Sequence, residues 1–202
     1  MSEMIRTLGV FFLYALTALF AQNTVLARGM GVSRLIELTR DDDTSSLLFS
    51  TEICVVCLLN APLAWLINEW TKNYAWRTLV RPLSYIACSA VVCGVLWLAL
   101  TYLKLPRAKQ LQQMLPNAGF NSCVAGTLLV TTTQSYSMAQ SVGFALGSGA
   151  GYLLAVLLVA EARRRLQSSE VPRAFRGLPI VLIYIGILAL AVYGFAGHTV
   201  AI

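Results

Sequence analysis

The sequence is poor in charge: charged residues make up only 12% of its 202 residues, whereas hydrophobic residues make up 57%. This composition excludes an ordinary soluble domain. The chain also lacks a glycine-rich nucleotide-binding loop, a hydrolase triad and a zinc signature, and it has a single histidine. Its five cysteines fall within apolar stretches, so no extracellular disulfide framework is indicated. We therefore expect no catalysis by this chain alone.

What the sequence does contain is six long apolar segments. A helix needs about 20 mostly apolar residues to cross the hydrocarbon of a bilayer. The predicted spans are residues 7–27, 46–67, 79–103, 111–132, 138–160 and 176–197. They leave no room for a soluble domain, so residues 1–202 are predicted to form a single integral membrane domain in contact with the lipid bilayer.

The basic residues predict the orientation of these spans, because positive charge concentrates on the cytoplasmic side. The first, third and fifth loops carry eleven of the fifteen basic residues, and the opposite side carries four. Both termini are therefore predicted to lie on the outer side. The net charge of +6 is explained by this asymmetry and gives no indication of nucleic-acid binding.

The six spans divide into two similar halves, about 1–103 and 104–202. Asn23-Thr24 in the first span corresponds to Asn121-Ser122 in the fourth, at an offset of 98 residues. Glycines follow the first pair, and Pro116 precedes the second, so both spans are expected to be broken. Three spans per half require the second half to be inverted. The predicted fold is an all-α membrane protein with an inverted 3+3 repeat and broken first and fourth helices. The alternative is that these polar pairs only hold helices together.

Two further features have functional and structural interpretations. Glu52 is the only acidic residue within a predicted span, which indicates a proton or cation role, or else an ion pair with Arg28 or Arg40 or an interfacial position. Gly143, Gly147 and Gly151 recur every four residues, a spacing typical of close helix packing. We expect that glycine face to contact the fourth span or a neighbouring subunit.

The spacing of two cysteines suggests one more candidate site for chemistry. Cys54 and Cys57 share a helix face, which suits metal or redox chemistry but also arises easily among packing residues. They would join the chemistry of the helix breaks only if the second span faced the same centre, and we predict that it does not.

Several motifs resemble those of the Rnf/Nqr integral membrane subunits. The resemblance covers nearly the whole chain and is most specific in the C-terminal third. Its length, six spans and outside termini resemble the A-type subunit of the Rnf complex and the E-type subunit of sodium-pumping NADH:quinone reductase. The motifs are Asn23-Thr24-Val25-Leu26, Met30-Gly31-Val32-Ser33, the stretch from Leu115 to Gly126, Glu161-Ala162-Arg163-Arg164-Arg165-Leu166, Val171-Pro172-Arg173-Ala174-Phe175-Arg176-Gly177 and Gly194-Phe195-Ala196-Gly197.

The resemblance implies a place in the inner membrane of a bacterium, beside a homologous subunit of opposite topology and other redox subunits. In that family each of the two subunits supplies one cysteine per broken helix, and the four thiolates hold a 2Fe-2S cluster that carries electrons across the membrane, coupled to Na⁺ or H⁺ movement. Here the first motif is several residues shorter and has no cysteine. In the second motif Ser122 stands where the family has cysteine, and Cys123 follows one residue later. One residue turns a side chain by about 100° around a helix.

These departures leave two functional hypotheses. The first is a membrane subunit of a redox-driven ion-translocating complex, either with a cluster held in part by Cys123 or without one. The second is a cluster-free transporter of an ion or small solute. In both cases the helix-break site is expected to include Asn23, Thr24, Arg28, Asn121 and Ser122, with Glu52 as a further transport residue. A third possibility is a scaffold that assembles other subunits through the glycine face.

Overall fold

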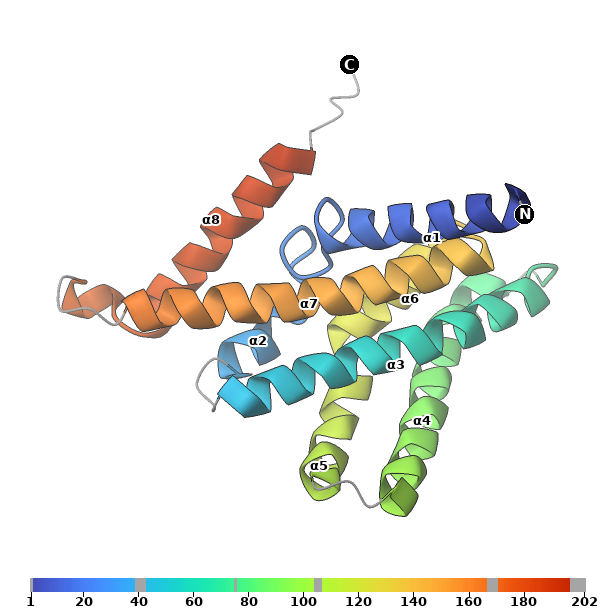
Figure 1. The fold of residues 1–202 in the computed structure, drawn as a ribbon, viewed down its shortest axis with the longest axis horizontal. Helices are drawn as coiled ribbons and strands as arrows, with labels where there is room; N and C mark the ends of the chain where they lie inside the picture. Colours follow the sequence, from blue (N-terminus) through green and yellow to red (C-terminus); the bar gives the residue numbers. More distant parts are fainter. Residues whose placement is uncertain (1, 39–42, 75, 104–106, 167–170, 197–202) are drawn as a thin grey trace.

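The computed structural model describes the chain except for residues 1, 39–42, 75, 104–106, 167–170 and 197–202. All of its regular secondary structure in this described part is helical (Figure 1). The elements are, in chain order, α1 (Ser2–Leu19), α2 (Val32–Leu38), α3 (Asp43–Trp70), α4 (Arg77–Leu103), α5 (Ala108–Gly119), α6 (Ser122–Thr133), α7 (Met138–Leu166), the short 3-10 helix η1 (Arg173–Phe175) and α8 (Leu178–Ala196).

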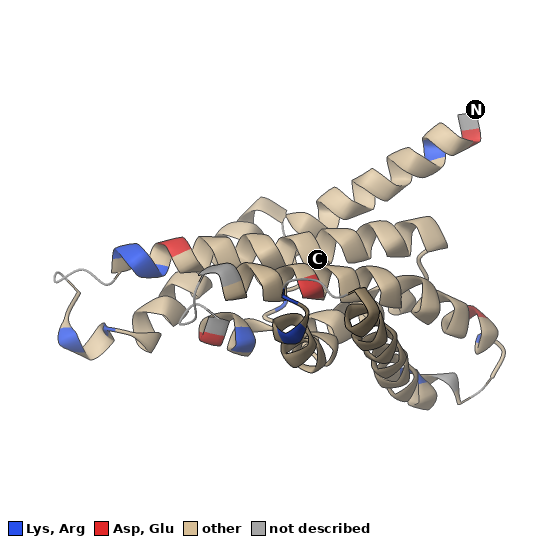
Figure 2. Cartoon of the chain, turned by 60° about the horizontal axis from the view of Figure 1, so that its bottom comes forward, with Lys and Arg blue, Asp and Glu red and all other residues tan. Residues whose placement is uncertain are grey.

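Four of the six predicted spans are continuous helices in the structure. α3, α4, α7 and α8 each contain a stretch that is long and apolar enough to cross a membrane. Figure 2 shows that most charged residues of these helices lie towards their ends, so their central turns carry little charge. This distribution suits helices that pass through hydrocarbon and end in the polar interfaces.

The other two predicted spans are interrupted. The fourth span is divided into α5 and α6, which are separated by Phe120 and Asn121 only. The first span was predicted to continue to residue 27, but α1 ends at Leu19, and irregular backbone joins it to α2. Gly29 and Gly31 in this connection have φ values of +68° and +79°, a left-handed backbone that glycine adopts readily. The sequence therefore placed both interruptions correctly and one helix end too late.

α7 lies at the centre of the molecule, between α1 and α3 (Figure 1). The glycine face of α7 is occupied by α1: a Cβ added at Gly143 or Gly147 would collide with the backbone carbonyls of Phe11 and Ala15. A Cβ added at Gly151 would lie 2.7 Å from the side-chain nitrogen of Asn23. The predicted partner of this face, the fourth span or another subunit, was therefore wrong. The face is buried within the chain, which removes the scaffold hypothesis that depended on it.

The packing of these helices fixes their relative directions. Along α7, successive glycines meet successive residues of α1, from Phe11 to Ala15, so the two helices run parallel. This arrangement is what the first and fifth spans of an alternating membrane protein require. Gly149, on another side of α7, leaves room for Cys54 of α3. α7 therefore approaches both neighbours closely because glycine replaces a side chain at each contact.

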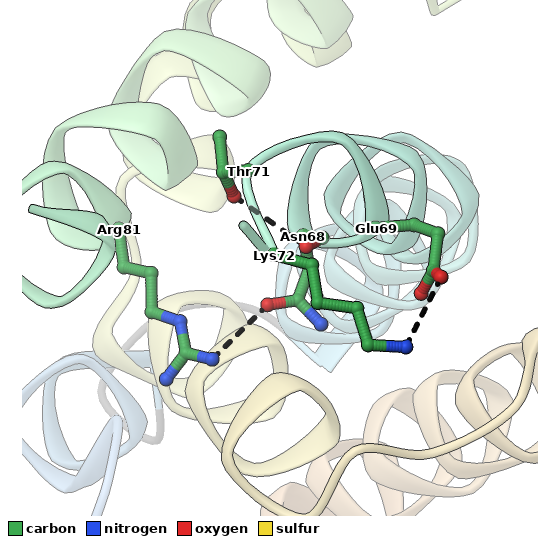
Figure 3. Close-up of polar contacts among 5 residues, drawn as sticks. All are labelled: Asn68, Glu69, Thr71, Lys72 and Arg81. Atoms are coloured by element: carbon green, nitrogen blue, oxygen red, sulfur yellow. Dashed lines mark hydrogen bonds and ion pairs between the residues drawn. The ribbon is translucent and has the colours of Figure 1, made fainter. Parts of the chain in front are cut away.

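The turn between α3 and α4 is held by polar contacts (Figure 3). The Arg81 guanidinium donates a hydrogen bond to the Asn68 side-chain oxygen at 3.2 Å, which joins the first turns of α4 to the end of α3. Glu69 and Lys72 form an exposed ion pair at 3.2 Å. Such exposed pairs contribute little stability. The Arg81 contact connects the two helices at this end.

Two glutamines tie α5 to its neighbours at the opposite end of α3 and α4. The Gln110 amide donates to the Ser45 hydroxyl of α3 at 3.1 Å, and the Gln112 amide donates to the Thr101 hydroxyl of α4 at 2.8 Å. α3, α4 and α5 therefore form a three-helix group. Its end near residues 45, 101 and 110 is polar, whereas its interior is lined mainly by leucines.

Candidate functional site at the two helix breaks

Asn23 closes the first break from inside the protein. Its side chain is 1% exposed, and its Oδ1 atom accepts hydrogen bonds from the backbone N–H groups of Val25 at 2.9 Å and Leu26 at 3.0 Å. Its Nδ2 atom donates to the carbonyls of Leu19 at 2.9 Å and Gly151 at 3.2 Å. One amide thus ends α1, starts the following helical turn and attaches both to α7.

Asn121 has the corresponding role at the second break. It is the N-cap residue of α6, and its Oδ1 atom accepts a hydrogen bond from the backbone N–H of Cys123 at 2.9 Å. It is also buried. The two asparagines aligned by the 98-residue offset therefore share a capping function, because each offers a side-chain oxygen to the N–H group two residues later.

The hydroxyl residue after each asparagine reaches across to the other break. The Thr24 hydroxyl lies 3.1 Å from the Cys123 sulfur, and the Ser122 hydroxyl accepts a hydrogen bond from the Gly31 N–H at 2.8 Å. Sequence-distant segments are thereby joined by two short polar contacts. The structure brings together four of the predicted site residues, Asn23, Thr24, Asn121 and Ser122, although it does so through bonds within the protein.

Gly31 allows the two breaks to approach this closely. A Cβ at Gly31 would lie 2.9 Å from a Tyr152 ring carbon, 3.0 Å from the Asn121 Oδ1 atom and 3.3 Å from the Cys123 Cβ atom. Its positive φ is also unfavourable for residues with a side chain. The Met-Gly element of the motif is therefore required for backbone approach at the centre of the site.

The interior side of α6 carries a thiol and hydroxyl cluster that also includes a residue of α3. Cys123 interacts with Thr24, Thr127 and Cys57, and Cys57 in turn interacts with Thr127. Both thiols are 0% exposed. The prediction that the second span would not face this centre was wrong for Cys57. Cys57 points to α6 because α3 packs along both α6 and α7.

The exposed side of α6 differs from this interior side because it is mostly apolar. Ser122 is exposed and lines a cavity of about 410 Å³ together with apolar groups of α4, α5 and the first break. Its lining residues include Met30, Tyr85, Phe120 and Leu129. Cys123 points away from this groove. The expected rotation of about 100° between neighbouring helix residues thus separates the Ser122 hydroxyl from the Cys123 thiol.

The 2Fe-2S cluster implied by the family resemblance needs four thiolate ligands. The groove presents the Ser122 hydroxyl at the position where the family has cysteine, and the first break supplies no thiol. Cys123 and Cys57 are enclosed by their own chain, so a cysteine of a second subunit would have no route to them. Among the described residues, no group of three cysteine, histidine or carboxylate side chains is arranged to bind a metal. These residues do not fit the cluster.

Glu52 lies apart from the helix breaks. Its side chain is 8% exposed, and neither carboxyl oxygen has a hydrogen-bond partner in the described part of the chain. It lines a separate cavity of about 190 Å³ between α3, α4 and α5. The expected ion pair with Arg28 is not formed, and Arg40, the other expected partner, lies outside the described residues. Sequence reasoning identified the residue but not its surroundings.

Arg28 is exposed and lies outside the buried cluster. Its charge acts on Tyr136 in the turn between α6 and α7: burial and the neighbouring Tyr14 raise the pKa of Tyr136, whereas the Arg28 guanidinium lowers it. The structure therefore places Arg28 at the edge of the first break. It does not bring the guanidinium to Asn121 or Ser122.

Comparison with known proteins agrees with this geometry. Residues 11–199 match the family described as "Rnf-Nqr subunit, membrane protein". The chain is 31% identical to the A-type subunit of the ion-translocating oxidoreductase complex of Syntrophotalea carbinolica over 180 residues, which cover 89% of this chain and 93% of that protein. The A-type subunit of the same kind of complex from Cereibacter sphaeroides is 27% identical over 94% of this chain and 98% of its own length.

A second group of relatives belongs to a different complex. The E-type subunit of the Na⁺-translocating NADH-quinone reductase of a Psychrobacter species is 28% identical over 92% of this chain and 96% of its own length. The family match extends from α1 to residue 199 and includes both helix breaks. This chain, a multi-pass membrane protein, therefore belongs to the Rnf-Nqr family of membrane subunits.

Proposed function

We propose that this protein is a membrane subunit of an Rnf/Nqr-type ion-translocating oxidoreductase complex. The observation that carries the proposal is the pair of capped helix breaks, tied to each other by Thr24 and Ser122, in a chain that matches the family over residues 11–199. Relatives named as subunits of two such complexes align with nearly the entire chain. In this proposal the chain acts with other redox subunits of the complex and is not catalytic alone.

The six-span inverted repeat is part of this proposal. The equivalent capping by Asn23 and Asn121 supports two halves with related local structures, and the parallel direction of α1 and α7 supports alternating spans. The eleven-to-four distribution of basic residues supports termini on the outer side of a bacterial inner membrane. A reporter fused to the C-terminus tests the orientation: activity only in the cytoplasm would refute it.

The partner proposed for the exposed groove is a homologous subunit of opposite topology. The groove is lined mostly by apolar groups, and it lies on the side of α6 that this chain leaves exposed. A second subunit would cover Phe120, which is 56% exposed, together with the neighbouring surface of α6. The groove therefore marks the face on which such a subunit would meet the break.

We further propose that this subunit holds no iron–sulfur cluster. The Ser122 hydroxyl replaces a thiol on the groove side, and both buried thiols are enclosed by the same chain. The break then has a structural role, because its polar groups bond to one another. The same observation argues against the alternative of a solitary transporter that binds solute at these polar pairs: the Asn23 amide has its oxygen and its nitrogen occupied by backbone groups.

The test is purification of the tagged chain with the subunits that accompany it, followed by measurement of iron, acid-labile sulfide and the visible spectrum. Co-purifying flavin- or ferredoxin-type subunits support the complex, and a chain that purifies alone refutes it. Iron must be assigned by comparison with a Cys123→Ser variant. Unchanged iron content in this variant is the expected result, because any iron then belongs to other subunits. Iron and sulfide lost specifically with Cys123 would refute the cluster-free proposal.

A further inference from the structure

The cavity around Glu52 lies inside the membrane domain, and the helix-break site does not use it. It is about 190 Å³ in volume and is lined by Thr51, Glu52, Val55, Leu96, Leu100, Leu111 and Leu115. Five of these seven residues are aliphatic. A carboxyl group in such surroundings costs free energy when it is charged and unpaired, so a residue of this kind in a membrane protein indicates function.

Among the described residues, the carboxyl group has no partner that would explain it as part of a structural ion pair. Both oxygens are buried and lack hydrogen-bond partners in the described residues. From α4, the titratable group that faces it is the Cys93 thiol, and from α5 the facing side chains are Leu111 and Leu115. No cation of the described chain acts on the carboxyl group. The environment therefore favours a neutral carboxyl over a carboxylate.

The donor set of this cavity distinguishes a proton from a metal cation. Metal cations in proteins are held by several oxygen ligands at once. Besides the two carboxyl oxygens, the side chains of the lining offer only the Thr51 hydroxyl oxygen, which is too few oxygens for such a coordination shell. A proton needs nothing beyond the carboxyl oxygen itself. The chemistry of the lining therefore fits proton binding.

The polar end of the three-helix group is the part of this group nearest to the cavity from which water could approach Glu52. Glu52 lies nine residues after the first residue of α3, which corresponds to about 14 Å along the helix axis. At that end, Gln110 and Gln112 place polar side chains against Ser45 of α3 and Thr101 of α4. These groups can support a file of hydrogen-bonded water, which aliphatic side chains alone could not.

From these observations we propose that Glu52 is an intramembrane proton-binding site, reached from the end of α3 near Ser45, through which this subunit takes part in ion translocation. The proposal rests on the proposed function, since a proton site is useful to a complex that couples redox chemistry to ion movement. It concerns a site separate from the helix breaks. The Glu52 carboxylate takes up a proton to become a neutral carboxyl group, and the neutral group releases that proton when it ionises, with only the O–H bond formed or broken.

The first test is reaction with dicyclohexylcarbodiimide, an apolar reagent that modifies neutral carboxyl groups, in native membranes that hold the complete complex. Mass spectrometry would compare the peptide that contains Glu52 with those that contain Glu69 and Glu161, whose side chains are exposed and paired with Lys72 and Arg165. We expect modification of Glu52 at least about tenfold above both controls, falling as the pH rises. Equal modification of the three would overturn the proposal. Protection by Na⁺ at constant pH would overturn it in favour of a metal cation.

The second test measures redox-driven ion uptake by the complex in liposomes, with Glu52→Gln compared with Glu69→Gln. We expect Glu52→Gln to assemble normally and to lose ion uptake by at least about tenfold, the scale of removing a proton-transfer group. Glu52→Asp should recover part of this loss, and Glu69→Gln should match the original chain. Undiminished uptake in Glu52→Gln would refute the proton site. Absence of ion uptake in the unsubstituted complex would instead refute the proposed function.

Discussion

Replacement of Asn23 by alanine is the most direct test of how the first break is held. The substitution removes one Oδ1 acceptor and one Nδ2 donor from a side chain that is 1% exposed. It leaves the N–H groups of Val25 and Leu26 without their side-chain partner. Each buried polar group left unsatisfied costs about 1–3 kcal/mol, so the two N–H groups together predict a loss of about 2–6 kcal/mol. The lost bond to Gly151 adds to this cost by loosening the contact with α7.

Two further alanine substitutions provide losses of stability with which that of Asn23→Ala can be compared. Asn121→Ala removes the cap on the Cys123 N–H and should cost about 1–3 kcal/mol. Asn117→Ala also removes an asparagine side chain, but from an exposed position one helical turn before Asn121. It should change stability by less than about 0.5 kcal/mol. The expected order of destabilisation is therefore Asn23, then Asn121, then Asn117.

The assay is thermal unfolding of the purified proteins in one detergent, followed by the amount of protein that remains monodisperse at each temperature. All variants must be heated at the same rate, because unfolding of such proteins is commonly irreversible. One kcal/mol corresponds to roughly 2–4 °C in Tm for a domain of this size, so Asn23→Ala should lower the Tm by at least about 4 °C. A Tm within about 1 °C of that of Asn117→Ala would refute the reasoning that the amide holds the break together.

Two more predictions concern the centre of the site. Gly31→Ala should reduce the yield of folded protein strongly, because it combines a left-handed φ with a collision, whereas Gly194→Ala, with no atom within 4 Å of its added Cβ, should leave the yield unchanged; similar yields for both would contradict the close approach at Gly31. In the folded protein a maleimide should label the partly exposed Cys93 much faster than Cys57 and Cys123, which are 0% exposed, and denaturation should remove the difference. Rapid labelling of Cys123 in the native state would show that the thiol faces the groove.

The two interruptions could be predicted because their signals are local. Proline, glycine and a capping asparagine act on the backbone within a few residues, so Pro116 and Asn121 mark a break wherever the helix lies. The 98-residue offset then aligned Asn121 with Asn23, and both proved to be caps. The end of α1 was placed too late because the first span is apolar on both sides of its last turn. Hydropathy does not detect the loss of helical hydrogen bonds.

The partners of side chains could not be predicted, because they depend on contacts between distant segments. Cys57 was expected to face away from the break, yet it meets Cys123 of α6. The glycine face of α7 was assigned to the wrong neighbour, since a spacing of four residues shows that a helix approaches closely but not which one. Glu52 was expected to be within reach of an arginine, and the structure gives it a cavity without a cation among the described residues.

The sequence alone indicates that this chain is a membrane protein, where its helices are interrupted, and to which family its motifs are similar. These properties follow from hydrophobicity, charge distribution and short-range backbone chemistry, which are written residue by residue. Only the folded chain shows that Thr24 and Ser122 each bond to the opposite break, and that Cys123 is enclosed while Ser122 faces the groove. It also gave Glu52 a cavity of its own. These outcomes depend on helix rotation and on which helices touch, and both are set only when the whole bundle packs.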